Sequence, residues 1–558
     1  MSDQSPSLEV VYDPTDPMHR REQMFPRLSP DMVKRIAVYG EEEAVPAGTL
    51  LFQRGQRGAD FFLVLEGLIE IFELDKFGQA NVFTIHAARQ FSGEMNLFNQ
   101  RGILASARVA VDSRVVRVRP ENFRRMVAAE SDISEIIMRA FILRRVGLIR
   151  LGYGGVVLVG PGHSADTLRL ERFLVRNGYP HRLIDTEVDP DASGFIACFQ
   201  LRHDQLPVVI CPEHCFLQNP STSELADELG LTEIIDPNTV YDVAVMGAGP
   251  AGLAAAVYAA SEGLSTIVVE GLAPGGQAGT SSKIENYLGF PTGISGQALA
   301  GRAQAQAQKF GARLAISRHA VGIDCSVQPY QLQLDDGQSL QARVVIVATG
   351  ARYRKLDVPG YTDFEGAGIH YAATAIEGQL CVNEEVVVVG GGNSAGQAAV
   401  FLSRIAGHVH VLVRANGLAA TMSDYLVQRI AQSSTITLHA CSEIVNLEGE
   451  GRLQRVTWRH RNSGELTTRP VGNMFVMIGA EPNTEWLKDC LALDAKGFVM
   501  TGRCEEGHLL DSPFATTKPG IFAVGDVRAG SVKRVASGVG EGSVVIQAVH
   551  HYLHPEAG

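Results

Sequence analysis

Cysteine and tryptophan are scarce in this chain, which has eight cysteines and two tryptophans in 558 residues. The cysteines are widely scattered, so the composition is not that of a secreted scaffold held by disulfides. No apolar run approaches the roughly 20 residues that a membrane-spanning helix needs. The first residues have neither a basic start nor an apolar core, so we expect no signal peptide and a cytoplasmic location.

Basic residues are fewer than acidic residues. The chain has 49 lysines and arginines against 61 acidic residues, which gives a formal net charge of −12. This balance argues against non-specific binding to nucleic acid or to an anionic membrane, so neither is expected as a partner. The hydrophobic content of 45 % is ordinary for a globular protein, and the length predicts roughly three or four domains.

The 58 glycines gather in motifs rather than in linkers. Gly247-x-Gly249-x-x-Gly252 lies between a predicted strand and a predicted helix, and Glu270 ends the next predicted strand. This is the context of a dinucleotide-binding fingerprint. Gly247 permits the tight turn, Gly249 lets the backbone approach a pyrophosphate, and Gly252 lets helix and strand pack closely. Glu270 can accept hydrogen bonds from ribose hydroxyls, while the helix N-terminus faces the phosphates.

A second strand, glycine turn and helix begin at Glu385. Gly390, Gly392 and Ala395 occupy the three small-residue positions, and Arg414 follows the next predicted strand. An acid there would hold an NAD ribose but repel a 2′-phosphate, whereas an arginine favours NADP. Two such units in one chain predict two dinucleotides that meet face to face.

The order of the surrounding segments is specific. GGQAGTSSKIENYLGFP follows the first fingerprint, VVIVATGA closes the first half, and TTKPGIFAVGDV returns after the second unit. From Tyr241 to Leu553 the chain resembles the low-molecular-weight thioredoxin reductase family. The resemblance implies an enzyme that uses FAD and NADPH. By position it assigns FAD contacts to Gly275, Gly276, Gln277, Asn286, Gly525 and Asp526, and NADP contacts to Gly392, Asn393, Ser394, Ala395 and Arg414. Arg534 stands near the flavin loop, where that family usually has glutamine.

The chain departs from the family at the redox-active segment. The family carries Cys-Ala-Thr-Cys-Asp just before its second fingerprint, whereas this chain reads Tyr371-Ala372-Ala373-Thr374-Ala375-Ile376. Both thiols and the acid are missing there, so we expect no disulfide reduction by the family's standard route. Cys381 is the nearest sulfur and the one candidate catalytic thiol, although a lone cysteine beside a buried strand is usually a core residue.

The N-terminal region alternates short β-like runs with glycine turns, which predicts a small β-barrel or jelly roll. GTLLFQRGQRGADFFLVLEGLIEIF, followed by QFSGEMNLF, resembles the cyclic-nucleotide-binding domain family. Gly93 and Glu94 match that family's ligand-binding pair. The family's phosphate-binding arginine has no match, because Leu104 stands near its place with Arg101 and Arg108 displaced to either side. The region is therefore either a nucleotide sensor or a degenerate regulatory or structural domain.

The segment between these regions resembles the thioredoxin and glutaredoxin fold. Its predicted order is strand, helix, strand, strand and helix, and Pro207 precedes the third strand at the position that is cis in that fold. Gly162-His163-Ser164-Ala165 replaces the redox Cys-x-x-Cys at the start of the first helix. Cys211, His214 and Cys215 supply only three candidate metal ligands, so no metal site is predicted and structural thiols are expected, Cys198 included.

The resulting architecture is multidomain. It consists of an N-terminal tail (1–24), a cyclic-nucleotide-binding-like β-barrel (25–150), a thioredoxin-like α/β domain (151–237), an FAD-binding domain (238–355 with 482–558) and an NADP-binding domain (356–481). The predicted function is an NADPH-dependent flavin oxidoreductase, expected as a homodimer, whose electron acceptor stays open between a thioredoxin-like protein, a ferredoxin or flavodoxin and a small molecule. A flavin- and ligand-binding sensor with little turnover is the alternative from another class.

Overall fold

The computed structural model describes residues 20–555 apart from a set of short gaps. The gaps are residues 75–78, 94–96, 98–101, 152–154, 191, 194–195, 197–201, 203–204, 212–215, 282, 420, 488–489 and 505–506. The chain divides into two compact units, Met1–Gly155 and Val156–Gly558. None of the helices in the described part has both the length and the apolar character required to traverse a lipid bilayer.

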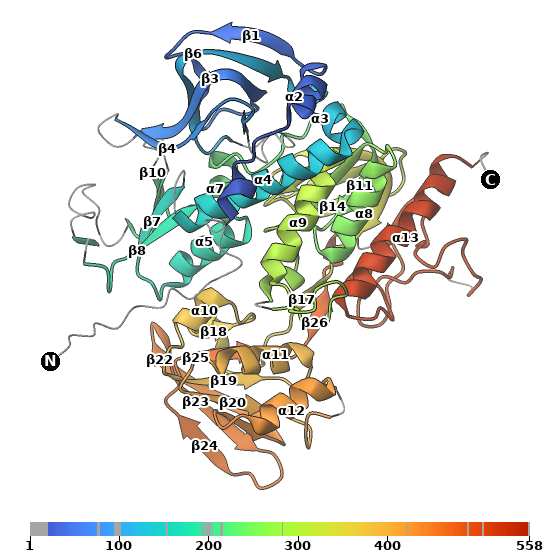
Figure 1. The fold of residues 1–558 in the computed structure, drawn as a ribbon. Helices are drawn as coiled ribbons and strands as arrows, with labels where there is room; N and C mark the ends of the chain where they lie inside the picture. Colours follow the sequence, from blue (N-terminus) through green and yellow to red (C-terminus); the bar gives the residue numbers. More distant parts are fainter. Residues whose placement is uncertain are drawn as a thin grey trace, which may run out of the picture. The chain divides into compact units, whose positions relative to one another are not determined.

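The first unit is an antiparallel sheet with flanking helices (Figure 1). Its strands pair in the order β1-β6-β3-β4, with β2 on β6 and β5 on β3, so the two long strands β3 and β6 carry the others. The strands are β1 (Glu41–Val45), β2 (Leu50–Phe52), β3 (Phe61–Leu74), β4 (Ala80–His86), β5 (Phe91–Ser92) and β6 (Ser106–Val118). The helices are α1 (Arg21–Met24), α2 (Pro30–Ala37), α3 (Pro120–Ala129) and α4 (Ser131–Leu151).

The prediction for this region is a small β-barrel or jelly roll, and the described strands do not form a closed barrel. No ladder between the described strands joins the two edges of the sheet, so the structure establishes a branched sheet and not a barrel. The β3–β6 pairing changes register around Glu66 and Leu68, and such irregularities bend a strand and end its regular pairing. Gly67 lies at this bend with φ +91, and a Cβ there would come within 2.0 Å of Ser113 Oγ.

The second unit begins with a four-stranded domain, residues 156–236. Its sheet has the order β10-β9-β7-β8, with β7 parallel to β8 and the other pairs antiparallel. The peptide bond between Leu206 and Pro207 is cis, as expected from the sequence. The elements are β7 (Val156–Gly160), α5 (Ala165–Arg176), β8 (His181–Asp185), β9 (Val208–Ile210), β10 (Phe216–Gln218) and α7 (Thr222–Glu228). Helix α7 begins with a capping box between Ser221 and Glu224.

The first Rossmann-like domain follows. Its sheet has the order β13-β12-β11-β16-β15-β14, with β27 from the C-terminal region on β16, and its central strands are parallel. Helices α8 and α13 pack against one another on the sheet (Figure 1). The elements are β11 (Val240–Met246), α8 (Pro250–Ser261), β12 (Thr266–Glu270), η4 (Ala278–Thr280), α9 (Gly296–Lys309), β13 (Arg313–Ile316), β14 (Ala320–Asp324), β15 (Tyr330–Leu334), β16 (Ser339–Val347), η6 (Glu485–Leu487), β27 (Ile521–Ala523), η7 (Gly525–Val527) and α13 (Val535–Leu553).

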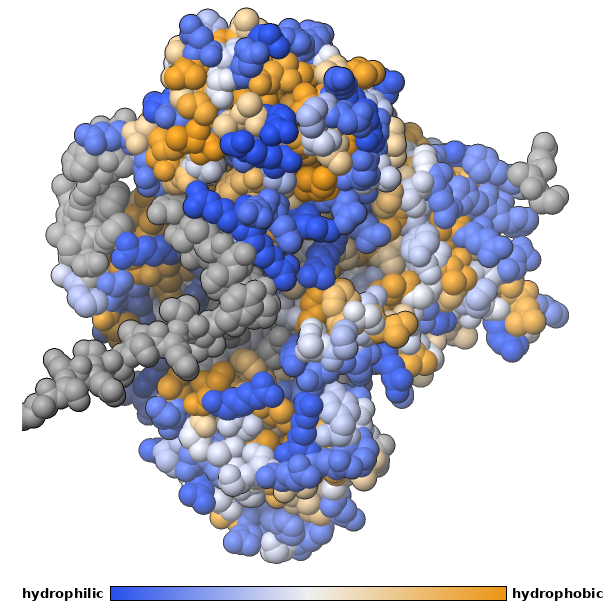
Figure 2. Space-filling view, in the orientation of Figure 1, coloured by the Kyte–Doolittle hydropathy of each residue, from blue (hydrophilic) through white to orange (hydrophobic). Residues whose placement is uncertain are grey.

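The second Rossmann-like domain has a parallel sheet of order β18-β25-β19-β20-β21 and a separate antiparallel sheet β22-β23-β24. Strand β24 is exposed along most of its length, and the lower part of Figure 2, where this sheet lies, is largely hydrophilic. The elements are η5 (Tyr361–Phe364), β18 (Ile369–His370), α10 (Ala375–Gln379), β19 (Glu385–Val389), α11 (Asn393–Leu402), β20 (His408–Leu412), α12 (Asp424–Gln432), β21 (Ile436–His439), β22 (Ser442–Glu450), β23 (Arg452–His460), β24 (Leu466–Arg469) and β25 (Asn473–Val476). The antiparallel pair β17 (Ala351–Tyr353) and β26 (Ala480–Pro482) connects the two domains.

Candidate functional site

The turn after β11 is built from backbone alone. Gly247 has φ +107, and a Cβ on Gly252 would lie 1.9 Å from the Gly247 carbonyl oxygen, so neither position can take a side chain without moving the helix. Gly249 is the N-cap of α8, and a Cβ there would meet no atom within 4 Å. The helix N-terminus is thus held tightly against the strand while its outer side stays open at Gly249, which suits a phosphate.

Glu270, the residue predicted to bind a ribose, lies beside this turn. The Glu270 carboxylate accepts hydrogen bonds from the backbone N–H of Ala248, at 2.8 Å, and of Leu272, at 3.0 Å. These bonds fix the carboxylate next to the glycine turn. A carboxylate can accept about four hydrogen bonds, so Glu270 keeps capacity for a hydroxyl donor.

The Gly-Gly-Gln segment folds back onto the same turn. The Gly275 N–H donates to the Ala248 carbonyl at 2.7 Å. Gly276 has φ +52, and a Cβ there would lie 3.1 Å from Gly249 Cα. The Gln277 side-chain amide donates to the Ala351 carbonyl. The structure therefore brings these three predicted residues together at the first fingerprint, whereas Asn286 is exposed on the following loop.

The C-terminal Gly-Asp pair reaches the other side of α8. A Cβ on Gly525 would lie 2.9 Å from Ala251 Cβ, and the Gly525 N–H donates to the Glu541 carboxylate at 2.6 Å. Burial raises the pKa of the neighbouring Asp526. Among the described residues no donor reaches the Asp526 carboxylate, which leaves it free for a hydroxyl of a bound ligand. Arg534, the N-cap of α13, is exposed.

The second fingerprint repeats the first. Gly390 has φ +141, and a Cβ there would lie 2.3 Å from the Met477 carbonyl oxygen. Gly392 is the N-cap of α11, and like Gly249 it would place a Cβ in open space. Ala395 is buried against the sheet. The second unit therefore also presents an open helix N-terminus beside a closed turn.

Three further predicted residues surround this second turn. The Asn393 side-chain oxygen accepts from the Ser423 N–H at 2.7 Å, so it ties α11 to the start of α12. Ser394 and Arg414 are exposed, and Arg414 stands two residues after β20. Arg414 is therefore accessible to an anionic group at this edge of the sheet.

The segment that replaces the family's dithiol contains an ion pair that sequence reasoning missed. Glu377 is buried on α10, and its carboxylate accepts from the Thr374 N–H at 3.0 Å and from the Thr374 hydroxyl. The Arg172 guanidinium of α5 donates to the same carboxylate at 2.8 Å. Burial opposes ionisation, but Arg172 and Thr374 hold the pKa of Glu377 below its usual value. This segment therefore does contain an acid. It is Glu377, which follows Ile376, and Ile376 occupies the position where the family has aspartate.

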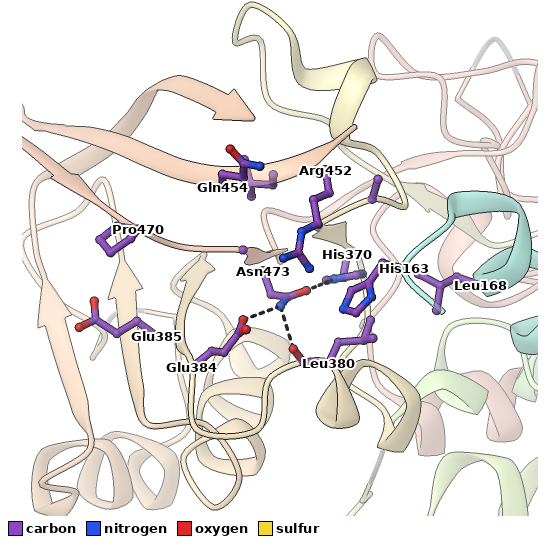
Figure 3. A pocket seen from close by; sticks show the side chains of 14 residues that line it. His163, Leu168, His370, Leu380, Glu384, Glu385, Arg452, Gln454, Pro470 and Asn473 are labelled. Atoms are coloured by element: carbon purple, nitrogen blue, oxygen red, sulfur yellow. Dashed lines mark hydrogen bonds between the residues drawn. The ribbon is translucent and has the colours of Figure 1, made fainter. Parts of the chain in front are cut away.

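A buried histidine extends this network (Figure 3). His370 Nδ1 lies 3.0 Å from the Arg172 guanidinium and Nε2 lies 2.9 Å from the Asn473 side-chain oxygen. Asn473 in turn donates to the Leu380 carbonyl at 3.1 Å and reaches the Glu384 carboxylate at 3.4 Å. Burial, aided by the charge of Arg172, lowers the pKa of His370 to about 4, so the ring is neutral near pH 7.

These residues border a cavity of about 330 Å³ between α5 and the second Rossmann-like domain. His163 and Leu168 line it from the four-stranded domain, while Arg452 and Asn473 line it from the other side (Figure 3). His163 lies just before the start of α5, so this cavity lies beside the Gly162–Ala165 segment.

Cys381 lies in the core of the second Rossmann-like domain. It is fully buried, and its thiol donates to the Glu377 carbonyl at 3.1 Å. Burial raises its pKa to about 12, with the charges of Glu384 and Glu377 acting in the same direction. A reactive cysteine needs a lowered pKa and access, so these facts favour the packing role over the catalytic one.

Two of the other cysteines are paired with each other rather than free. Cys325 and Cys490 form a disulfide across 165 residues of sequence. Cys211 is a buried free thiol, while Cys198, His214 and Cys215 lie outside the described residues.

The nucleotide-like site of the first unit is described only in part. Gly93 has φ +124, whereas Glu94 and Arg101 fall in the gaps of the described chain. Leu104 is buried, and Arg108 donates to the Glu70 carboxylate at 2.8 Å and lies over the Phe72 ring. Arg108 is thus engaged within its own sheet.

Two Rossmann-like domains, each with a glycine turn closed on backbone and open at a helix N-terminus, define an α/β oxidoreductase that binds dinucleotides. The chain belongs to the pyridine nucleotide-disulphide oxidoreductase family, which residues 241–542 match. Residues 42–130 match the cyclic nucleotide-binding domain family. These matches confirm two of the three resemblances stated from the sequence, those to the thioredoxin reductases and to the cyclic-nucleotide-binding domain.

Thioredoxin reductases are among the similar proteins. That of Bacillus subtilis is 33 % identical over 315 residues, which cover 56 % of this chain and 95 % of the relative. The NADPH-dependent thioredoxin reductase 3 of Arabidopsis thaliana is 30 % identical over 354 residues, which cover 60 % of this chain and 65 % of the relative. The crystal structure of Lactococcus lactis thioredoxin reductase has a TM-score of 0.52 and 30 % identity, covering 56 % of this chain and 99 % of that one. The thioredoxin reductase of T. acidophilum gives a TM-score of 0.52 at 29 % identity, with 57 % and 99 % coverage.

Sequence motifs do not indicate the residues that join α5 to the other domains. Arg172 and Glu377 are 205 positions apart, and Arg172 lies on the polar side of an amphipathic helix, where a charge is normally solvated. Of these residues, only Glu377 could have been identified from the sequence, because it stands one residue after the position of the acid in the family motif. A search that allowed a shift of one position would have found it.

The buried histidine generates a prediction on pH. In the unfolded chain His370 takes up a proton near its ordinary pKa of 6.5, whereas in the folded protein its pKa is about 4. Between these values the unfolded chain binds more protons, so the free energy of unfolding falls as the pH falls. We expect the melting temperature of wild type to drop from pH 6.5 to pH 4, and His370→Gln to show a flatter dependence. Thermal melts of His508→Gln, which changes an exposed histidine, should keep the wild-type slope; an equally steep slope in His370→Gln would contradict the assignment.

Proposed function

We propose that this protein binds FAD at the first fingerprint and NADPH at the second, and that it transfers electrons from NADPH through the flavin to an external acceptor. The observation that carries the proposal is the pair of matching turns, closed at Gly247 and Gly390 and open at Gly249 and Gly392. The free carboxylate of Asp526 fits the hydroxyls of a ribityl chain. FAD, when bound, would supply the chemistry by accepting hydride from the nicotinamide.

The protein's own groups then bind and orient the cofactors. The N-termini of α8 and α11 face the two diphosphates, and Glu270 accepts from a ribose hydroxyl. Arg414 pairs with the 2′-phosphate that distinguishes NADPH from NADH. The names of the thioredoxin reductase relatives support this division of roles, because one of them is called NADPH-dependent.

We also propose that the acceptor meets the flavin without a dithiol of this chain. Ala372 and Ala375 stand where the family's two cysteines would be, and Cys381 is buried with a raised pKa. A one-electron carrier or another small acceptor fits such a site better than a disulfide does. Similarity to the thioredoxin reductases keeps a thioredoxin-like partner as the competing acceptor.

The two N-terminal segments take regulatory or structural roles in this proposal. The four-stranded domain has the strand order and the cis-proline expected of a thioredoxin-like domain, but Gly162–Ala165 carries no thiol. The first unit is a cyclic-nucleotide-binding-type domain, in which buried Leu104 and the paired Arg108 disfavour capture of a cyclic phosphate.

FAD binding is tested by filling the open side of the first turn. The purified protein should be yellow with about one FAD per chain, and Gly249→Val should lose the colour because the new side chain occupies the place of the diphosphate. Gly301→Val is the matched control, since a Cβ at Gly301 on α9 also meets no atom within 4 Å. Absorbance at the flavin band, with circular dichroism as a check of folding, measures both. A Gly249→Val protein that keeps stoichiometric FAD would overturn the assignment.

The choice of nicotinamide cofactor is tested at Arg414. NADPH should reduce the flavin faster than NADH, and Arg414→Ala should remove about 1.5–3 kcal/mol of that preference, the range for hydrogen bonds to charged groups. Anaerobic stopped-flow reduction with each nucleotide measures the preference. Arg455→Ala removes an exposed arginine that pairs with Glu448, and it should leave the ratio unchanged. If Arg414→Ala also leaves the NADPH/NADH ratio unchanged, another residue recognises the 2′-phosphate.

The acceptor is tested with the Cys381→Ser variant. Wild type should oxidise NADPH with ferricyanide, since each NADPH yields two electrons and a proton and two ferricyanide ions each take one electron. It should reduce an aromatic disulfide dye negligibly. Cys381→Ser should change neither rate, because the thiol is buried and protonated. A thioredoxin-dependent activity in wild type that this substitution abolishes would show that the electrons pass through Cys381.

A further inference from the structure

Helix α5 carries three arginines whose surroundings differ. Arg169 donates to the Asp166 carboxylate and to the Asn219 side chain, and Arg172 pairs with Glu377. Arg176, the last residue of the helix, has no carboxylate within ion-pair distance among the described residues. The third arginine thus forms no direct ion pair among the described residues, although the charge of Glu270 acts on it from a greater distance.

Arg176 is partly buried, and its side-chain Nε is fully shielded from solvent. Its guanidinium makes one hydrogen bond, from a terminal nitrogen to the Gly276 carbonyl at 3.0 Å, and its Nε is buried without a partner. Burial lowers the pKa of Arg176, while Glu270 and Tyr353 act in the opposite direction. A guanidinium has five N–H donors, and a partly buried guanidinium that makes one hydrogen bond leaves most of these donors without a partner, which is unfavourable. Such an arrangement is typical of a site that is completed by an anion.

The position of Arg176 identifies that anion. Gly276, which accepts its hydrogen bond, lies against Gly249 with a built Cβ 3.1 Å from Gly249 Cα. Asn177, the next residue, donates to the Leu272 carbonyl at 3.1 Å, so the helix end is fixed over the loop that follows Glu270. The guanidinium therefore stands beside the open helix N-terminus of the first fingerprint, where a dinucleotide places its diphosphate.

We propose that Arg176, supplied by the four-stranded domain, is an additional binding residue for the diphosphate of the FAD held at the first fingerprint. This inference rests on the proposed function, because it needs FAD at that site. The domain whose Gly162–Ala165 segment carries no thiol thereby gains a role in cofactor retention. Arg176 binds the cofactor and takes no part in the hydride transfer itself.

Three substitutions separate the charge of Arg176 from its hydrogen bond to Gly276. Arg176→Lys keeps the charge, Arg176→Gln keeps a donor for the carbonyl but not the charge, and Arg176→Ala removes both. The dissociation constant of FAD is measured by flavin fluorescence on the full-length chain after FAD has been removed, at low and high salt. Arg169→Ala on the same helix is the control, and circular dichroism verifies that each variant is folded.

We expect the Gln and Ala variants to bind FAD roughly 10- to 100-fold more weakly, as the loss of a charged hydrogen-bond partner implies. Arg176→Lys should stay near wild type, and the salt dependence should be shallower in the Gln and Ala variants because a charge pair has been lost. Equal affinity in the Lys and Gln variants, or wild-type affinity in all three, would overturn the inference and reduce Arg176 to a docking residue. In both cases the wild type would still bind FAD and Gly249→Val would not, so the proposed function would stand. A wild type that takes up no FAD would overturn both.

Discussion

The close contact between Gly252 and the Gly247 carbonyl is the constraint on which the second unit depends. Because no side chain separates helix α8 from strand β11, the helix N-terminus lies directly at the end of the strand. Three other parts of the first site lie next to this contact. They are the end of β12 with Glu270, the folded-back loop with Gly276, and the C-terminal Gly525, which lies beside Ala251. Any larger residue at Gly252 would move α8 and separate these elements together.

The two Rossmann-like domains follow from the sequence almost completely. Glycines at fixed spacing between an apolar strand and a helix leave the backbone few alternatives, so the turn at Gly247 and its copy at Gly390 are predictable from the amino-acid order alone. The capping box at Ser221 is local in the same way, because its two partners lie three residues apart. Local rules determine local geometry, and the fingerprint is a local motif.

What the sequence did not reveal depends on contacts between distant segments. The alternating pattern of the first unit predicts a small β-barrel or jelly roll, but strand propensity does not encode where the long strands β3 and β6 bend, as they do near Gly67. Arg172, Arg176 and Glu377 are charged residues that a sequence pattern assigns to a solvated surface. Their burial arises only when α5 packs against two other domains, and no single-segment pattern contains that information.

Helix α5 therefore has a mechanical consequence for the whole second unit. One end of the helix is joined to the second Rossmann-like domain through Arg172, and the other is joined to the first through Asn177. The strand pair β17–β26 also connects these two domains. With α5 in place, a rotation of one domain against the other would leave the buried Glu377 without its cation, and breaking a buried ion pair in this way costs on the order of 3–5 kcal/mol. The four-stranded domain thus adds, through α5, a second connection between the two Rossmann-like domains beside the β17–β26 pair.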